Sequence, residues 1–195
     1  MFMNTHILIG KSIVENIDPN KSFFISDKNF IYGNIKPDVS SKYVLQKHYL
    51  EESLEMIFSK VEYLCTLDLD SISKYFSISK FSQELGVICH FLCDFFCVPH
   101  SRRWEMSHSM NKHIAYEKEL SIVARESNLK KFKGDNIEAN SFREFFNSIY
   151  VEYQSKTEYK NDLLFSNYVC NSVVDYILNA ILSNTAKSYT LINCG

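Results

Sequence analysis

The sequence is poor in the two residues that shape turns and tight loops. Only 5 glycines and 3 prolines occur in 195 residues. Glycine-rich loops that cradle phosphate groups, such as GxxxxGKS or GxxxxGKT, are therefore missing, and so is the turn chemistry that a β-sandwich needs between its strands. These absences exclude a P-loop nucleotide-binding protein and argue against a β-rich fold. Long helical segments are what remain.

The chain also lacks the charge and hydropathy patterns of several protein classes. The formal net charge is -2 and no run of five or more like charges occurs, so a surface for duplex DNA or RNA is not expected. No stretch of about 18 apolar residues is free of charged side chains, which argues against a transmembrane helix. The amino-terminal segment has neither a positively charged start nor a small-residue cleavage site. We therefore expect a cytoplasmic protein whose 6 cysteines stay thiols.

What the sequence does contain is apolar residues at helical spacing. A length of 195 residues suits one domain with a substantial core, and no linker or internal repeat divides it. We therefore predict an all-α, single-domain helical bundle over residues 1–195. A loop carrying Gly33, Pro37 and Asp38 is expected between the first two helices. The predicted helices cover about 4–16, 41–64, 78–97, 109–131, 141–154 and 160–192, the last either continuous or broken near Ser183 or Asn184.

The predicted helix over 78–97 is apolar on most of its circumference, which indicates a central position in the bundle. Pro99 is expected to end this helix just before His100, because proline cannot continue a helix. His90 and Asp94 lie inside the segment. We therefore expect both side chains to be buried.

Five potential metal ligands in this region form the patterns HxxxDxxxxxH and HxxxE: His90, Asp94, His100, His113 and Glu117. Residues four apart share one face of a helix, so each inner pair can act as a two-ligand clamp. Imidazole and carboxylate are ligands that suit zinc. A buried hydrogen-bonded pair is the alternative for His90 and Asp94 alone. A carboxylate in an apolar helix needs cations or donors around it, however, so the whole cluster predicts a metal site.

Three further residues of ligand type lie outside this cluster. His6 is on the first predicted helix, Asp38 follows a proline in the predicted loop, and His48 is on the second predicted helix. Each is ordinary when taken alone, because a surface histidine is the more common case. His108 competes with His113 as a ligand, but only His113 has a carboxylate four residues later.

Taken together, these residues resemble the bacterial zinc-dependent phospholipase C family, which is related to the zinc-dependent single-strand nucleases of fungi and plants. The resemblance extends from about His6 to Glu117, in the family's order and with most of its spacings. The segments that carry it are NTH at 4–6, GNIKPD at 33–38, KH at 47–48, GVICHFLCDFFCVPH at 86–100 and HIAYE at 113–117.

The resemblance implies a bundle of helices around a centre of up to three zinc ions in a cleft. In the family, one ion is assigned to the residues that match Asp38, His48, His90 and Asp94. A second ion is assigned to those that match His100, His113 and Glu117. His6 and Asp94 hold the third ion, so that Asp94 bridges two of them.

The implied reaction is hydrolysis of a phosphodiester by a metal-activated water, which gives diacylglycerol and a phosphorylated head group if the substrate is a phospholipid. Asp38 is the candidate for guiding or deprotonating the attacking water, and Asp94 is the candidate for bridging the ions beside it. Any peripheral contact with a membrane is expected from the helical domain itself.

Two departures from the family's pattern affect these expectations. Secreted members expose an N-terminal tryptophan whose amino and carbonyl groups complete the third metal site, whereas the only tryptophan here is Trp104. Met1 lies five residues before His6, so either its amino group takes that role or the third site is weak or empty. Val39 stands where family phospholipases place an aromatic residue that contacts choline by cation–π attraction, which leaves choline specificity open.

Two alternatives remain beside a phospholipase. A nuclease-type phosphodiesterase has the same fold and metals, although Glu117 stands where the nucleases carry aspartate and no Gly-Gly-Asn stretch follows His100. A non-catalytic helical protein would keep the metals for stability or partner binding. The eight ligand-type residues argue against it, because a structural zinc site is usually four-coordinate and closed.

A stripe of cysteines accompanies the ligand cluster. Cys89, Cys93 and Cys97 recur at every fourth position, about 100° around the helix from His90 and Asp94. Thiolates at this spacing can bind zinc, but cysteine also packs as a small hydrophobic residue in crowded helix contacts. We favour core packing for all three.

Overall fold

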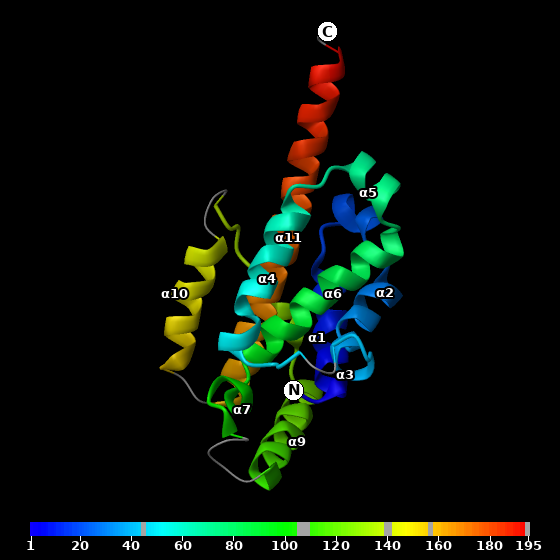
Figure 1. Cartoon of the computed structure of the whole chain (residues 1–195). Helices are drawn as coiled ribbons and strands as arrows, with labels where there is room; N and C mark the ends of the chain where they lie inside the picture. The colour runs from blue at the N-terminus through cyan, green and yellow to red at the C-terminus, as the bar shows by residue number, and fades with distance from the viewer. Residues whose placement is uncertain (44–45, 105–109, 139–141, 156–157, 194–195) are drawn as a thin grey trace.

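The computed structural model describes residues 1–43, 46–104, 110–138, 142–155 and 158–193. Within these ranges the chain forms helices and no β-strand, so the all-α prediction is confirmed. Figure 1 shows the helices gathered in a bundle beyond which the C-terminal end of the last helix extends. The elements are α1 (Met3–Asn16), η1 (Pro19–Phe24), α2 (Asp27–Gly33), α3 (Lys36–Val39), α4 (Leu50–Cys65), α5 (Leu69–Tyr75), α6 (Ile78–Phe95), α7 (Val98–Ser101), α9 (Met110–Glu126), η2 (Leu129–Lys131), α10 (Phe142–Gln154) and α11 (Tyr159–Asn193).

Helix α6 is the central element of the bundle. Its hydroxyl N-cap Ser77 accepts a hydrogen bond from the backbone N–H of Lys80 at 3.1 Å, which fixes where the helix begins. Every residue from Leu85 to Phe95 is buried, and the helix contacts α1, α2, α4 and α11 (Figure 1). The predicted central position of this segment is confirmed. So is the burial of His90 and Asp94, which are 0% and 1% exposed.

The backbones of α2 and α6 touch, because each helix has a glycine at the crossing. A Cβ atom on Gly33 would meet the Cα of Gly86 at 2.9 Å, and a Cβ atom on Gly86 would meet the Cα of Gly33 at 2.7 Å. Neither position therefore has room for a side chain. The predicted loop placement of Gly33 is wrong, since this residue ends α2. The close approach brings Asn34, which follows α2, against the face of α6 that carries His90.

Prolines begin two short helices near the site. Pro37 lies in the first turn of α3 and Pro99 in the first turn of α7. The missing N–H of proline costs nothing in a first turn, where that group has no partner within the helix. Placing Pro37 and Asp38 in a loop is therefore wrong. Helix α6 already ends at Phe95, so Pro99 starts the next helix rather than ending this one.

In the described parts of the segment before α4, residues 41–43 and 46–49, the chain is not helical where the sequence predicted it to be. Helix α4 begins at Leu50, and His48 precedes it instead of lying on it. The backbone bonds here are those of turns: Tyr43 N–H donates to Ser40 O at 2.9 Å, and Gln46 N–H donates to Tyr43 O at 2.8 Å. Such bonds span three residues, whereas a helix of 3.6 residues per turn needs bonds that span four. The predicted start of this helix was therefore about nine residues too early.

Helix α11 is continuous over 35 residues, so the break considered near Ser183 or Asn184 does not occur. The side-chain amide of Asn184 donates to Cys65 O at 2.8 Å and to Leu67 O at 3.0 Å. Cys65 is the last residue of α4, whose final carbonyls have no partner within their own helix. A residue that resembles a helix breaker in sequence is instead a cap for a neighbouring helix. No helix in the described ranges is both long and apolar enough to cross a membrane.

Candidate metal centre

The eight ligand-type residues come from five helices and one connecting segment, and they gather at one end of α6. His6 lies on α1, Asp38 on α3 and His48 in the segment before α4. His90 and Asp94 lie on α6, His100 on α7, and His113 and Glu117 on α9. Six of them border a cavity of about 260 Å³, whereas His6 and His90 are fully buried and do not line it. The cavity is lined by Met1, Asp38, His48, Asp94, His100, Met110, His113, Ile114 and Glu117.

One oxygen of Asp94 faces two histidines and a second carboxylate. Asp94 Oδ2 lies 2.7 Å from His48 Nδ1 and 3.3 Å from His90 Nε2, and these two nitrogens are 3.1 Å apart. Asp38 Oδ1 is 3.6 Å from His90 Nε2 and 3.9 Å from His48 Nδ1. Ligand atoms about 2.0–2.1 Å from a tetrahedral zinc ion lie about 3.3 Å from one another. These five distances of 2.7–3.9 Å are close to the spacing of donor atoms in a zinc coordination sphere.

The ring of His90 is oriented by a backbone carbonyl. Its Nδ1 is 2.8 Å from the oxygen of Asn34, which can only accept a hydrogen bond. Nδ1 therefore donates to this carbonyl, and Nε2 faces Asp94. A hydrogen bond of this kind on the far nitrogen is usual for histidines that bind metals. The contact between Gly33 and Gly86 sets the position of this carbonyl, so helix packing and site geometry are linked.

The other oxygen of Asp94 faces the amino end of the chain. Asp94 Oδ1 lies 2.5 Å from the Met1 nitrogen, 3.3 Å from His6 Nε2 and 3.8 Å from His100 Nε2. His6 is fully buried, and neither of its ring nitrogens forms a hydrogen bond. Burial lowers the pKa of His6 to about 3, so the ring is neutral, as a metal ligand must be. A buried nitrogen that forms no hydrogen bond and lies beside a carboxylate fits the role of a metal ligand.

A third group of donors meets at Glu117. Its Oε1 lies 2.9 Å from His113 Nε2, 3.0 Å from His100 Nε2 and 3.1 Å from the Met1 nitrogen. His113 and Glu117 are four residues apart on α9, as the predicted clamp requires. Both pairs of ligand residues that the sequence placed on one helix face are thus brought together.

The position of the Met1 amino group shows that the site stabilises a positive charge. It lies among Asp94, Glu117 and His100, whose Nε2 is 3.0 Å away. Burial by itself lowers the pKa of this amino group, but the negative charge of Asp94, and with it that of Glu117, raises the pKa well above its usual value. A positive charge at the meeting point of carboxylate and imidazole ligands is therefore stabilised. The donor set fits a divalent cation such as zinc.

A buried carboxylate behind the site was not anticipated from the sequence. Asp162 on α11 accepts hydrogen bonds from Val98 N–H at 3.0 Å and from the hydroxyls of Tyr116 and Tyr153, each at 2.9 Å. Burial raises the pKa of Asp162 to about 7, and these donors oppose the rise. The bonds attach α7 and α9, which carry His100, His113 and Glu117, to α11. An isolated aspartate near the start of a helix gave no sequence signal of this role.

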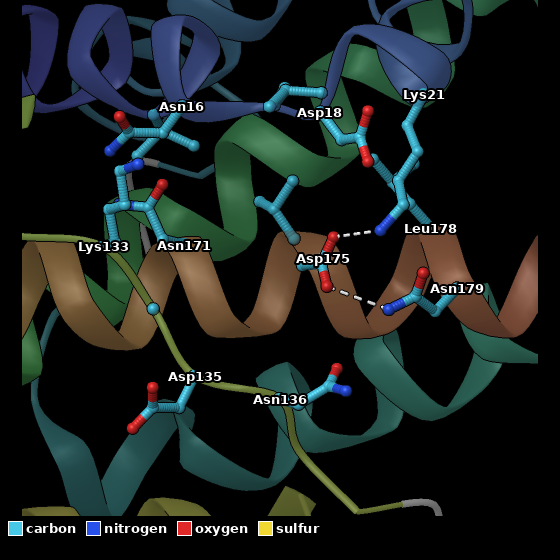
Figure 2. A pocket seen from close by; sticks show the side chains of 14 residues that line it. Asn16, Asp18, Lys21, Lys133, Asp135, Asn136, Asn171, Asp175, Leu178 and Asn179 are labelled. Atoms are coloured by element: carbon cyan, nitrogen blue, oxygen red, sulfur yellow. Dashed lines mark hydrogen bonds and ion pairs between the residues drawn. The ribbon is translucent and has the colours of Figure 1, made fainter.

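A second pocket of about 420 Å³ lies between the end of α1, the segment 133–136 and α11. Figure 2 shows Asp175 in this pocket between Lys21 and Asn179, both of which donate hydrogen bonds to it. None of the residues that line it is a histidine or a cysteine. This pocket therefore lacks the ligands of a zinc site and is separate from the candidate metal centre.

Comparison with protein families agrees with the site's composition. The family model for zinc-dependent phospholipase C matches residues 5–160 of the chain, which is well over half of its length. The chain belongs to this family. The matched segment contains all eight ligand-type residues, and membership supports a zinc-dependent hydrolase. Comparisons with curated proteins and with solved structures gave no match. His108, the competing histidine, lies outside the described residues.

Proposed function

We propose that this chain is a zinc-dependent phosphodiesterase that hydrolyses a phospholipid or a related phosphodiester. The observation that carries the proposal is the arrangement around Asp94, a carboxylate 1% exposed whose two oxygens face two different sets of nitrogen and oxygen donors. A single structural zinc would need four ligands and would leave no open position. A centre of this size beside an open cavity suits hydrolysis better.

We assign the donors to ions as the family's pattern suggests. One ion is held by Asp38, His48, His90 and Asp94. A second is held by His100, His113 and Glu117. A third is held by His6, Asp94 and the Met1 amino group, which gives up a proton to bind. The distances of 2.7–3.9 Å within the first set and of 2.9–3.0 Å within the second support this assignment.

The carboxylates in the site have different tasks because they differ in exposure. Zinc ions, when bound, lower the pKa of a coordinated water and neutralise phosphate oxygens. The side chain of Asp38 is 30% exposed, whereas that of Asp94 is 1% exposed. Asp38 can therefore contact a water in the cleft, orient it and accept its proton. Asp94 borders the cavity but is almost completely buried, and it holds the donor groups around it in place.

The rim of the cavity favours a substrate with an apolar part. Met110 and Ile114 line the cavity and are 55% and 48% exposed, and Val39 beside Asp38 is 51% exposed. Exposed apolar side chains at the mouth of a site mark a surface that binds lipid or protein. We therefore propose a phospholipid, approached by peripheral contact with a membrane, rather than a nucleic acid.

Metal analysis of the purified protein, paired with hydrolysis assays, tests this function. The substrates are a phospholipid, a chromogenic phosphodiester and single-stranded DNA, each with and without a chelator. Chelator-sensitive turnover of the phospholipid supports the proposal, and turnover of the DNA alone favours a nuclease. Bound zinc without turnover of any substrate would refute the enzyme and leave a non-catalytic metal protein.

A further inference from the structure

We propose that the thiolate of Cys97 is a protein ligand of the ion held by His100, His113 and Glu117. This inference rests on the proposed function, because it requires that the centre binds metal. It adds to the centre a sulfur ligand that the eight residues above do not include.

The first argument is distance. A ligand atom of Cys97, one of His100 and one of Glu117 all lie within 4.8 Å of one another. Bond lengths of about 2.3 Å to sulfur and about 2.0–2.1 Å to nitrogen or oxygen place such atoms about 3.6 Å apart around a tetrahedral zinc ion. Side-chain shifts of about 1 Å therefore bring the three atoms into one coordination sphere.

The second argument separates Cys97 from the other cysteines of the stripe. Cys93 Sγ lies 3.8 Å from Cys170 Sγ, and Cys170 Sγ lies 3.5 Å from the Cys89 carbonyl oxygen. Cys89 and Cys93 therefore pack against α11, as predicted for core residues. Helix α6 ends at Phe95, however, and Cys97 has an extended backbone with φ of -119° and ψ of 120°. Cys97 consequently leaves the helical stripe, although it is buried in the core as predicted.

The third argument is chemical environment. Cys97 is fully buried, and its neighbours include the charged groups of Met1, Glu117 and Asp94. A thiol at such a position is shielded from oxidants and alkylating agents, whereas an ion held by His100 and Glu117 would lie beside it. Zinc displaces the proton of a coordinating thiol, and that proton passes to solvent. A thiolate also favours zinc over magnesium or calcium, which take oxygen ligands.

The added ligand changes the expected role of this ion. With Cys97, His100, His113 and Glu117 it has four protein ligands, which is the closed arrangement of a structural zinc site. Activation of the water is then the task of the two ions that share Asp94, because Asp38, whose carboxylate is exposed to the cleft, lies next to His48 and His90 on that side of the centre. The two clamps thus have different tasks: the clamp on α6 supports chemistry, and the clamp on α9 holds a closed ion.

Cobalt substitution tests the inference on the full chain. Co²⁺ in place of zinc gives visible bands wherever it is bound and an intense near-ultraviolet charge-transfer band only where a thiolate coordinates it. We expect that near-ultraviolet band in the wild-type protein, and its loss in Cys97→Ser with the visible bands kept. Cys93→Ala is the matched control and should keep both. We also expect Cys97→Ser to weaken zinc binding at this position by tenfold or more.

The outcomes distinguish this inference from the proposed function. Visible cobalt bands without a thiolate band in the wild type, or a thiolate band that survives in Cys97→Ser, would overturn the inference alone. No bound cobalt at all would overturn the metal centre and the inference with it. If Cys97→Ser does not fold, X-ray absorption on the wild-type zinc protein decides the matter. A zinc–sulfur distance of about 2.3 Å supports the ligand, and scattering from nitrogen and oxygen alone refutes it.

Discussion

Replacing Asp94 with asparagine should remove one specific ion. Asparagine has the shape of aspartate but offers one oxygen acceptor and one NH₂ donor. Before metal binds, the oxygen will face the protonated Met1 amino group, which lies 2.5 Å from Asp94 Oδ1 and would repel the NH₂ group. The NH₂ group must then face His48 and His90, on the side now served by Oδ2. The ion bound with Asp38, His48 and His90 is therefore the one that should be lost.

The size of the effect follows from burial. Asp94 is 1% exposed, and loss of one partner from a buried charged pair costs about 3–5 kcal/mol. This corresponds to a loss of roughly 10²- to 10⁴-fold in affinity for the ion. Turnover should fall by at least as much, because the lost ion is the one beside the exposed Asp38.

The assay combines zinc content after dialysis into dilute zinc with turnover of a chromogenic phosphodiester. Circular dichroism checks that the helices are retained. Asp175→Asn is the matched control, because Asp175 is also a carboxylate that accepts a hydrogen bond from a cationic side chain, but in the separate pocket of Figure 2. The control should keep wild-type zinc content and turnover. Wild-type zinc content in Asp94→Asn, with turnover reduced less than tenfold, would refute the reasoning.

Three further predictions concern packing, pH and specificity. Gly86→Ala should lower the free energy of unfolding by about 1–3 kcal/mol, because the added methyl group overpacks α2 against α6. It should also weaken zinc binding, because the shift of α2 displaces the Asn34 carbonyl that orients His90. A variant that is destabilised but binds zinc as tightly as wild type would contradict this link. Asp162 has a folded pKa of about 7 and an unfolded pKa of about 3.9, so its contribution to stability is complete at acid pH and is lost as the pH rises toward 7. Denaturant unfolding of the zinc-loaded protein tests this. Between pH 5 and pH 7 the free energy of unfolding of the wild type should fall by about 2 kcal/mol relative to that of Asp162→Asn. Parallel pH profiles for the two proteins would contradict the raised pKa of Asp162. Val39→Tyr should raise kcat/KM for a choline phospholipid by about 2- to 30-fold through a cation–π contact worth about 0.5–2 kcal/mol, with no change for a phospholipid that lacks a cationic head group.

The long helices could be predicted from the sequence because periodicity alone decides them. Helix α6 is apolar on almost every side, and a segment of that kind can only be central. The same periodicity placed His113 and Glu117 on one face of α9. The pair His90 and Asp94 and the pair His113 and Glu117 are each local in sequence, so no knowledge of the fold was needed to find them.

The short helices and the supporting contacts depend on tertiary structure. Helix α3 has four residues and cannot be stable alone, so no pattern within it indicates a helix. His48 was assigned to a helix because apolar spacing continues upstream of Leu50, where turns replace the helix. The group that orients His90 is the backbone carbonyl of Asn34. Every residue has such a carbonyl, so the amino-acid sequence does not show which one makes this contact. Cys97 lies outside the helical stripe of cysteines because α6 ends at Phe95, two residues before the end predicted from the sequence.

The division of Asp94 between two sets of donors has a thermodynamic consequence. Its Oδ1 and Oδ2 belong to one carboxylate, so an ion that binds on one side withdraws charge from the other and fixes the side chain for both. The two affinities are then coupled, and the coupling must be equal in both directions. Filling the centre is consequently not a series of independent events. In the centre that we propose, the zinc concentration at which either of these two ions binds depends on whether the other is already present.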